Sequence, residues 1–279
     1  MREEIWLTRC CRLFSILVIC IFVLSFSGRN AFAEDLRLAT TTSTDNSGLL
    51  AFLLPVFHAD EGITVRVISV GTGKALKLGE NGDVDVVLVH SRPDEDRFIV
   101  QGHGVNRHDV MYNDFVIVGP AKDPATLRGT RDVIEAFDRI ADAQTTFVSR
   151  GDDSGTHKME LRYWAQLERQ PEDNSGYRSA GRGMGEVLLM ASELRAYALT
   201  DRATFYAMAD KLDLEIVVKG DPRLFNPYGV MAVNPAKYPD INFEGAMRFI
   251  NWLTSVKGRQ SIAAFRVDGK QLFIPGTGR

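Results

Sequence analysis

The chain has 279 residues, a formal net charge of −3, and 45% hydrophobic and 25% charged residues. These proportions are typical of a globular protein with one or two domains. They exclude an intrinsically disordered, a collagen-like or a polytopic membrane protein. The small negative charge and the lack of a basic run argue against a nucleic-acid partner.

The first 33 residues carry the three parts of a secretory signal peptide. Three arginines precede an apolar run at 13–26, and Ala31-Phe32-Ala33 offers a small-x-small cleavage site. An uncleaved membrane anchor is the weaker alternative, because the run is shorter than the ~20 residues that span a bilayer. Bulky Ile19 disfavours a lipid anchor on Cys20. Cleavage after Ala33 removes all three cysteines, so we expect a periplasmic or secreted protein without disulfide bonds.

Strand-like and helix-like segments alternate along the rest of the chain. The pattern predicts strands at 36–39, 64–70, 84–89, 145–148, 196–199 and 215–218, and helices at 49–57, 75–78, 158–167, 187–194 and 201–211. This order predicts an α/β fold with a mostly parallel sheet covered by helices. Pro55 is expected to kink the first helix or to end its first part.

Two further apolar strands, at 114–118 and 228–233, are bounded by Gly-Pro or Asn-Pro dipeptides. If both strands cross between two lobes, lobe I is 34–118 plus 227–279 and lobe II is 119–226. From the pattern alone, two strands within one large sheet are the alternative.

Three loops rich in hydroxyl groups and glycine, at 40–45, 69–73 and 149–156, each lie between a predicted strand and a predicted helix. Helix N-termini expose unpaired N–H groups and about half a positive charge, so such loops bind anions. Three helix ends supply roughly +1.5, and Arg150, the only cation in these loops, supplies +1, against −2 for a small oxyanion. The alternative to an anion-binding role is an ordinary helix cap for any one loop, and a surface ion pair for Arg150.

Two other kinds of site fit the residues less well. The segment 151–155 is similar to the nucleophile loop of chymotrypsin-like proteases. However, the α/β pattern, the missing disulfides and the lack of a histidine spaced to serve Ser154 make a serine hydrolase a remote alternative. His103 and His108 have no second ligand cluster, so neither a metal site nor a cofactor is expected.

Several motifs, in order, resemble those of the tungstate-binding proteins of bacterial ABC uptake systems, the TupA-like family. They are Ala39–Leu49, Val70–Leu76, Asp83–Val86 with His90-Ser91, Met111–Phe115, Phe147–His157 and Tyr197–Asp201. The resemblance covers nearly all of the chain after residue 33. It implies a two-lobed periplasmic binding protein fold (type II), with the ligand cleft between lobes that two hinge strands join.

The resemblance also implies a function and a set of oxyanion-binding residues. The protein is expected to be a monomeric, non-enzymatic solute-binding protein that delivers tungstate to the permease subunits of an ABC transporter. The implied binding residues are Thr42, Ser43, Thr72, Ser149, Arg150, Ser154, Gly155 and Thr156. The chain departs from the family at 92–96, which is more charged than expected, and this stretch is interpreted as a changed surface loop.

Other tetrahedral oxyanions are the alternatives to tungstate. Molybdate has the same charge and shape and nearly the same size. Phosphate and sulfate are less favoured alternatives. Phosphate-binding proteins use acidic residues to accept the phosphate proton, and in this chain His90-Ser91 stands in place of the second acidic residue. We expect Asp152 to orient Arg150 or to cap a helix. A sensor module that binds the same anion is a further alternative.

Overall fold

The computed structural model describes residues 35–277. The predicted signal peptide at 1–33 lies outside the described residues, so its cleavage and the anchor alternatives stay predictions. In the part that is described, none of the helices has the length and apolar character needed to cross a membrane.

The central sheet has the strand order β12-β4-β9-β3-β1-β2. Its strands are β1 (Leu36–Thr41), β2 (Val65–Val70), β3 (Val86–Val89), β4 (Gly104–Gly119), β9 (Phe225–Val233) and β12 (Ile274–Pro275). β1 is parallel to β2 and β3, whereas β9 is antiparallel to both β3 and β4. The sheet is therefore mixed and not mostly parallel as predicted, because β4 leaves it for a second lobe and β9 returns in the opposite direction.

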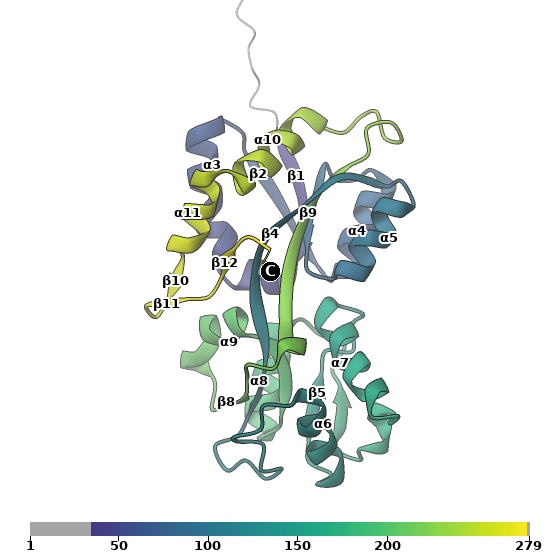
Figure 1. Ribbon diagram of the computed structural model, residues 1–279, viewed down its shortest axis with the longest axis vertical. Helices are drawn as coiled ribbons and strands as arrows, with labels where there is room; N and C mark the ends of the chain where they lie inside the picture. The colour runs from purple at the N-terminus through teal and green to yellow at the C-terminus, as the bar shows by residue number, and fades with distance from the viewer. Residues whose placement is uncertain (1–34, 278–279) are drawn as a thin grey trace, which may run out of the picture. The chain divides into compact units, whose positions relative to one another are not determined.

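β4 and β9 run side by side through the middle of the described structure (Figure 1). The far end of β4 pairs with β7 (Ala198–Asp201) and β8 (Glu215–Val218). Separate hydrophobic clusters surround β1–β3 on one side and β5, β7 and β8 on the other. The architecture is thus two-lobed with two connecting strands, and we keep the predicted boundaries, after 118 and before 227, as a proposal.

Helices cover the sheets of both lobes (Figure 1). The first lobe holds α2 (Thr42–Asn46), α3 (Leu49–Glu61), α4 (Thr72–Asn81), α5 (Arg92–Val100), α10 (Phe243–Thr254) and α11 (Val256–Ala264), with the short strands β10 (Arg266–Val267) and β11 (Lys270–Gln271). The second lobe holds α6 (Val133–Asp142), α7 (Gly155–Gln166), α8 (Met184–Leu194) and α9 (Arg202–Met208), with β5 (Phe147–Ser149) and β6 (Tyr177–Ser179). Short 3-10 turns occupy Pro171–Asp173, Ala209–Lys211 and Pro222–Leu224.

Helix α3 does not end at Pro55, in contrast to one of the two predicted outcomes, but continues to Glu61. Leu53 and Phe57 are buried in the core, whereas Pro55 lies on the exposed side of the helix. The carbonyl group that loses its amide partner there can bond to water, which lowers the cost of an internal proline.

Residues 92–100 form helix α5, so the interpretation of 92–96 as a surface loop is wrong. Asp94 and Glu95 are buried. Glu95 accepts hydrogen bonds from the Ser91 amide (3.0 Å) and from Arg107 Nε (2.8 Å). Burial raises the pKa of Glu95 to about 7, and these partners oppose the shift without cancelling it. The burial of Asp94 and Glu95 could not be read from the segment itself, because Lys158 and Arg107 pair with them from other elements.

The second lobe begins where β4 passes the ring of Tyr197. The Tyr197 hydroxyl donates to Asp123 Oδ1 (2.7 Å) and accepts from the Ala125 amide (2.9 Å), so two hydrogen bonds of the hydroxyl group fix the position of the ring. A Cβ atom on Gly119 would lie 2.4 Å from two carbon atoms of this ring. Only glycine therefore fits at this end of β4 without displacing the ring.

We predict that Gly119→Ala lowers the free energy of unfolding by about 1–3 kcal/mol, because the added methyl group overpacks the contact with Tyr197. Urea unfolding followed by circular dichroism measures the change. Gly183→Ala is the control, since its Cβ would have no neighbour closer than 3.8 Å. Equal losses in the two variants would contradict the steric explanation.

Candidate functional site

The three predicted anion-binding loops all lead into helix N-termini. α2 follows β1 directly, α4 follows β2 after Gly71, and α7 follows β5 after the loop 150–154. Helix α2 has only five residues, so its dipole is small and its hydroxyl groups contribute more than its N-terminus.

The second-lobe loop contacts both first-lobe loops. Arg150 Nη2 donates to Thr42 Oγ1 at 3.3 Å, and the Gly155 amide donates to Thr72 Oγ1 at 3.1 Å. A Cβ on Gly155 would lie 3.2 Å from the same Thr72 oxygen, so glycine permits this close approach. The structure thus brings four of the eight predicted residues together at the boundary between the lobes.

Arg150 is a buried cation at this boundary, with 2% of its surface exposed. Its Nη2 pairs with Asp152 Oδ2 at 2.6 Å, whereas its Nε has no partner. Thr156 Oγ1, in the first turn of α7, is also buried and unpaired. Because an unsatisfied buried polar group costs about 1–3 kcal/mol, both atoms favour a ligand that can accept hydrogen bonds.

Asp152 pairs with Arg150, which is one of the two roles expected of it, whereas the N-cap of α7 is Ser154. One carboxylate oxygen holds Arg150, and the other accepts from the Ser154 amide at 3.2 Å. Both oxygens therefore already have donors inside the loop. Asp152 thus orders the loop that carries Arg150.

Ser154 caps helix α7, because its Oγ accepts from the His157 amide at 3.2 Å. The His157 ring is used elsewhere, since its Nδ1 accepts from the Asp153 amide at 3.1 Å. A Ser–His pair of the kind that a serine hydrolase needs is therefore not formed by these two residues.

Ser149 lies beneath the second-lobe loop. Its Oγ accepts from the Gly151 amide at 3.3 Å, and its side chain is also hydrogen-bonded to Glu160. Burial raises the pKa of Glu160 to about 7, although hydrogen bonds from Ser149, Tyr177 and Trp164 oppose the shift. Among the eight predicted residues, Ser149 is consequently the one whose hydroxyl group is least available to a ligand.

His90 belongs to the same cluster, although the sequence reasoning did not assign it to the site. It is buried just after β3, with Nε2 at 3.1 Å from Ser43 Oγ and 3.2 Å from Thr41 Oγ1. Burial lowers the pKa of His90 to about 4, so the ring is neutral at neutral pH. The available signal was its position at the carboxyl end of a buried strand, where ligands of open α/β sheets bind.

An ion pair links the lobes beside the loops. Lys158 Nζ in α7 lies 2.9 Å from Asp94 Oδ2 in α5, and Asp94 also pairs with Arg97 of its own helix at 3.1 Å. Burial alone would raise the pKa of Asp94, but hydrogen bonds from Ser91 and Lys158 outweigh burial and lower it. The pair therefore favours contact between α5 and α7.

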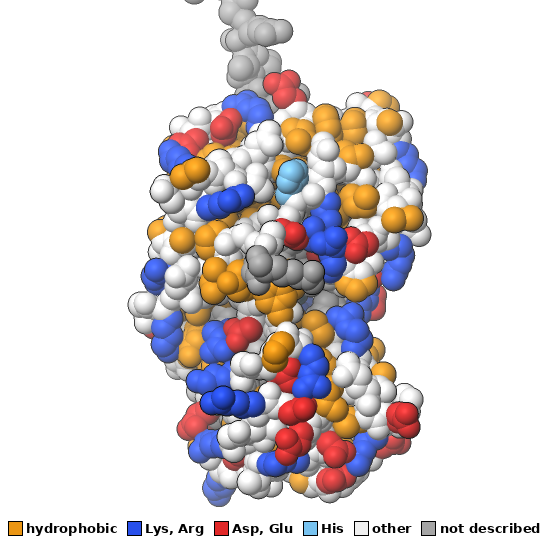
Figure 2. All heavy atoms as spheres, viewed as in Figure 1, with side chains coloured by type: hydrophobic (Ala, Val, Ile, Leu, Met, Phe, Trp, Pro, Cys, Tyr) orange, Lys and Arg blue, Asp and Glu red, His pale blue; other side chains and the backbone are white. Residues whose placement is uncertain are grey.

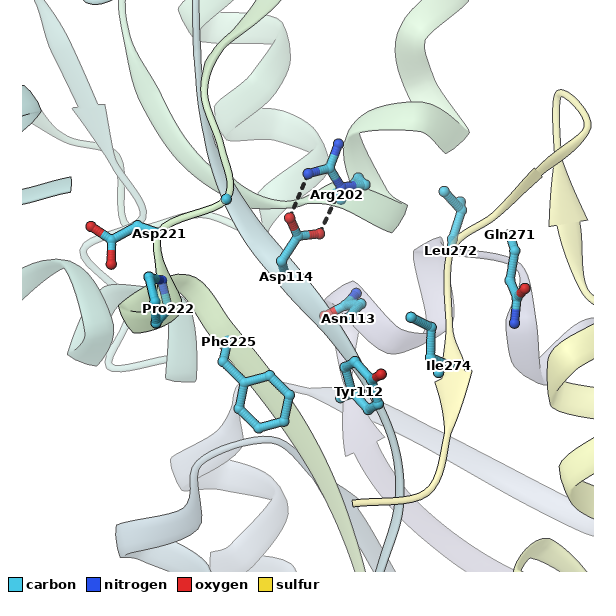
Figure 3. Close-up of a pocket in the computed structure, with 11 residues that line it drawn as sticks. Tyr112, Asn113, Asp114, Arg202, Asp221, Pro222, Phe225, Gln271, Leu272 and Ile274 are labelled. Atoms are coloured by element: carbon cyan, nitrogen blue, oxygen red, sulfur yellow. Dashed lines mark hydrogen bonds and ion pairs between the residues drawn. The ribbon is translucent and has the colours of Figure 1, made fainter. Parts of the chain in front are cut away.

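A pocket of about 360 Å³ lies beside the connecting strands β4 and β9 (Figure 3). Its lining is mostly apolar and includes Tyr112, Phe225, Leu272 and Ile274, with the Asp114–Arg202 ion pair in its wall. None of the eight predicted residues lines this pocket. An apolar lining does not suit a doubly charged ion.

Charges of both signs are interspersed over the face shown in Figure 2, without a broad patch of either sign there. Within residues 35–277, no group of three or more His, Cys, Asp or Glu side chains is placed to hold a metal ion.

Comparisons with known proteins give close matches over most of the chain. A profile of the PBP superfamily domain matches residues 30–257. The tungstate-binding protein TupA of Peptoclostridium acidaminophilum is 48% identical over 246 residues, which cover 87% of this chain and 86% of that protein. The solved structure of the tungstate ABC transporter from Geobacter sulfurreducens is 52% identical, with a TM-score of 0.77 over 83% of this chain and 99% of that one. TupA from Desulfovibrio alaskensis G20 is 46% identical, with a TM-score of 0.75 over 87% and 98% of the two chains.

We predict that Lys158→Ala loosens the contact between the lobes. A partly exposed ion pair contributes about 0.2–1 kcal/mol, so the Gly155 amide, which bonds to Thr72 across the boundary, should exchange its hydrogen up to about fivefold faster. Hydrogen exchange followed by NMR measures this rate. Arg97→Ala is the matched control, because it removes the other partner of Asp94 within one lobe. A similar acceleration of Gly155 exchange in both variants would show that the Lys158–Asp94 pair does not hold the two lobes together.

Proposed function

Because the chain belongs to the PBP superfamily and, within it, to the family of the TupA tungstate-binding proteins, we propose that it captures tungstate and delivers it to the permease subunits of an ABC transporter. The proposed role is binding without catalysis, with tungstate as cargo and no cofactor. The proposal places the protein in the periplasm or outside the cell, as a monomer. The secretory pattern of the first 33 residues supports this location.

One observation carries the proposal: the buried Arg150 at the lobe boundary has an unpaired Nε, and the unpaired Thr156 hydroxyl lies in the same loop–helix segment. Tungstate near neutral pH is a dianion without a proton, so its site should supply donors. Thr42, Ser43, Thr72, Ser149, Ser154 and Gly155 complete the proposed set, with hydroxyl groups and backbone amides. Ser149 contributes mainly by supporting the loop.

The charges of the site are suited to a dianion. Arg150 supplies +1, and the N-termini of α4 and α7 supply about half a charge each, which together balance −2. Asp152 reduces this positive charge, so directed hydrogen bonds must provide much of the affinity. Hydrogen bonds to charged groups contribute about 1.5–3 kcal/mol each, and several of them suffice to replace a hydration shell.

Molybdate is the second candidate, since the same donors fit it equally well, and phosphate or sulfate follow. Phosphate at neutral pH carries a proton that requires an acceptor. Asp152 bonds to Arg150, but His90-Ser91 stands where phosphate binders place a second acidic residue, which favours a ligand without a proton.

The proposed function is tested by a thermal-shift panel of tungstate, molybdate, sulfate and phosphate on the purified protein. A ligand present at 100 times its Kd stabilises the folded state by about 2.7 kcal/mol. We expect tungstate to raise the Tm most, molybdate next, and sulfate and phosphate little at the same concentration. A larger shift with phosphate than with tungstate would refute the proposal.

Arg150→Ala should weaken tungstate binding at least about tenfold, or about 1.4 kcal/mol, because it removes the only side-chain cation of the three loops. Isothermal titration calorimetry measures the affinity. Arg139→Ala is the control, since Arg139 pairs with Glu135 on the surface of α6. An unchanged affinity of Arg150→Ala for tungstate would show that Arg150 does not bind the anion.

A further inference from the structure

A row of buried polar side chains crosses the two connecting strands. Asn113 lies on β4 and Asn226 on β9, and the two are partners in the strand register. Asn113 Nδ2 donates to Asp201 Oδ1 at 3.4 Å, Asn226 Nδ2 donates to Asn113 Oδ1 at 2.6 Å, and Asn226 Oδ1 lies 3.0 Å from His90 Nδ1. We call these four residues the hinge relay. It joins the second lobe, through Asp201, to the first-lobe loop that His90 contacts.

The direction of every hydrogen bond in the relay follows from its Asp201 end. Asp201 Oδ1 accepts from the Thr204 amide at 2.9 Å, so this oxygen is only an acceptor in the ionised carboxylate, and also in a carboxylic acid whose proton is on Oδ2. Asn113 must therefore face it with Nδ2, which directs Asn113 Oδ1 toward Asn226.

The orientation of Asn226 in turn determines which nitrogen of the His90 imidazole carries the proton. Asn226 faces Asn113 with its Nδ2, which also lies 3.4 Å from the Tyr228 hydroxyl, so its Oδ1 is left for His90. His90 Nδ1 must then carry the proton and donate it to Asn226. Since burial keeps the ring neutral, Nε2 has no proton and is an acceptor.

This acceptor faces the hydroxyl groups of the first-lobe loop. Thr41 Oγ1 accepts from the Thr44 amide at 3.2 Å and lies 2.6 Å from Thr44 Oγ1. Ser43 Oγ lies 3.1 Å from both Thr41 Oγ1 and His90 Nε2, so the Thr41 and Ser43 hydroxyl groups compete for this acceptor. In the arrangement that we propose, Thr44 donates to Thr41, and Thr41 donates to His90 Nε2. The Ser43 hydroxyl proton is then free for a ligand.

We propose that His90 is the positioning residue of the first-lobe anion loop, and that Asp201 fixes its Nδ1-protonated tautomer through Asn113 and Asn226. The tautomer follows from the relay alone, whereas the effect on a ligand rests on the proposed function. Because the relay passes through both connecting strands, the orientation of the Ser43 donor is tied to the hinge.

The tautomer is tested directly by NMR of the imidazole nitrogens in the 15N-labelled wild-type protein at pH 7. We expect a protonated Nδ1 and an unprotonated Nε2 for His90, whose signals are assigned by their loss in His90→Gln. A protonated Nε2, or an equal mixture of tautomers, overturns the proposal without any further variant.

Two substitutions at Asp201 test the origin of the tautomer. Asp201→Asn keeps an oxygen that can accept from Thr204 and Asn113, so the Nδ1-protonated form should persist. Asp201→Leu removes this acceptor, and the imidazole signals should then show both tautomers. The same single tautomer in both variants would show that Asp201 does not set it.

Asn226→Leu tests the effect on binding. It interrupts the relay without changing the charge, and we expect the Kd for tungstate to rise about tenfold by calorimetry. Asn234→Leu is the matched control, because Asn234 also loses two hydrogen bonds, to Gly102 and Ala236, but lies outside the relay. Equal affinities in these two variants overturn the positioning role. A wild-type protein that shows the expected tautomer but binds no tungstate would instead refute the proposed function.

Discussion

The burial of Arg150 between the two lobes is the constraint on which the site depends. A guanidinium with 2% of its surface exposed is stable only if its charge is compensated, and Asp152 provides part of this compensation at 2.6 Å. The unpaired Nε shows that the compensation is incomplete. The remaining positive potential comes from Arg150 together with the N-termini of α4 and α7, so it is concentrated at the lobe boundary.

The two connecting strands do more than join the lobes. Their paired residues Asn113 and Asn226 carry a polar row that ends at His90, beside the Ser43 hydroxyl. Buried amides without partners would be costly, so a fully bonded row orders each of its members. The hinge thereby determines the hydrogen-bond direction at the first-lobe loop, while the second-lobe loop is ordered separately by Asp152 and Ser154.

The misinterpreted segments share one physical cause. The charges at 92–96 indicated a surface loop, yet Asp94 and Glu95 are buried because Lys158 and Arg107 reach them from other elements. Pro55 was expected to kink or to end a helix, and of these two outcomes the ending does not occur, because the proline lies on the exposed side of α3. In both cases local propensity was overridden by partners or solvent that only the folded chain provides.

The sequence alone determined the α/β pattern, the two strands at 114–118 and 228–233 and the three loops at helix starts, because spacing of apolar residues and the positions of Gly, Ser and Thr are local properties. It left open whether those two strands cross between lobes. Its motifs also indicated the family that the comparisons later showed. Only the tertiary structure decided that Ser149 faces Glu160, that Asp152 bonds to Arg150 and to the Ser154 amide, and that His90 belongs to the cluster. These facts depend on contacts between residues up to 136 positions apart, as for His90 and Asn226, and hydrogen-bond direction across such distances is not encoded in any local pattern.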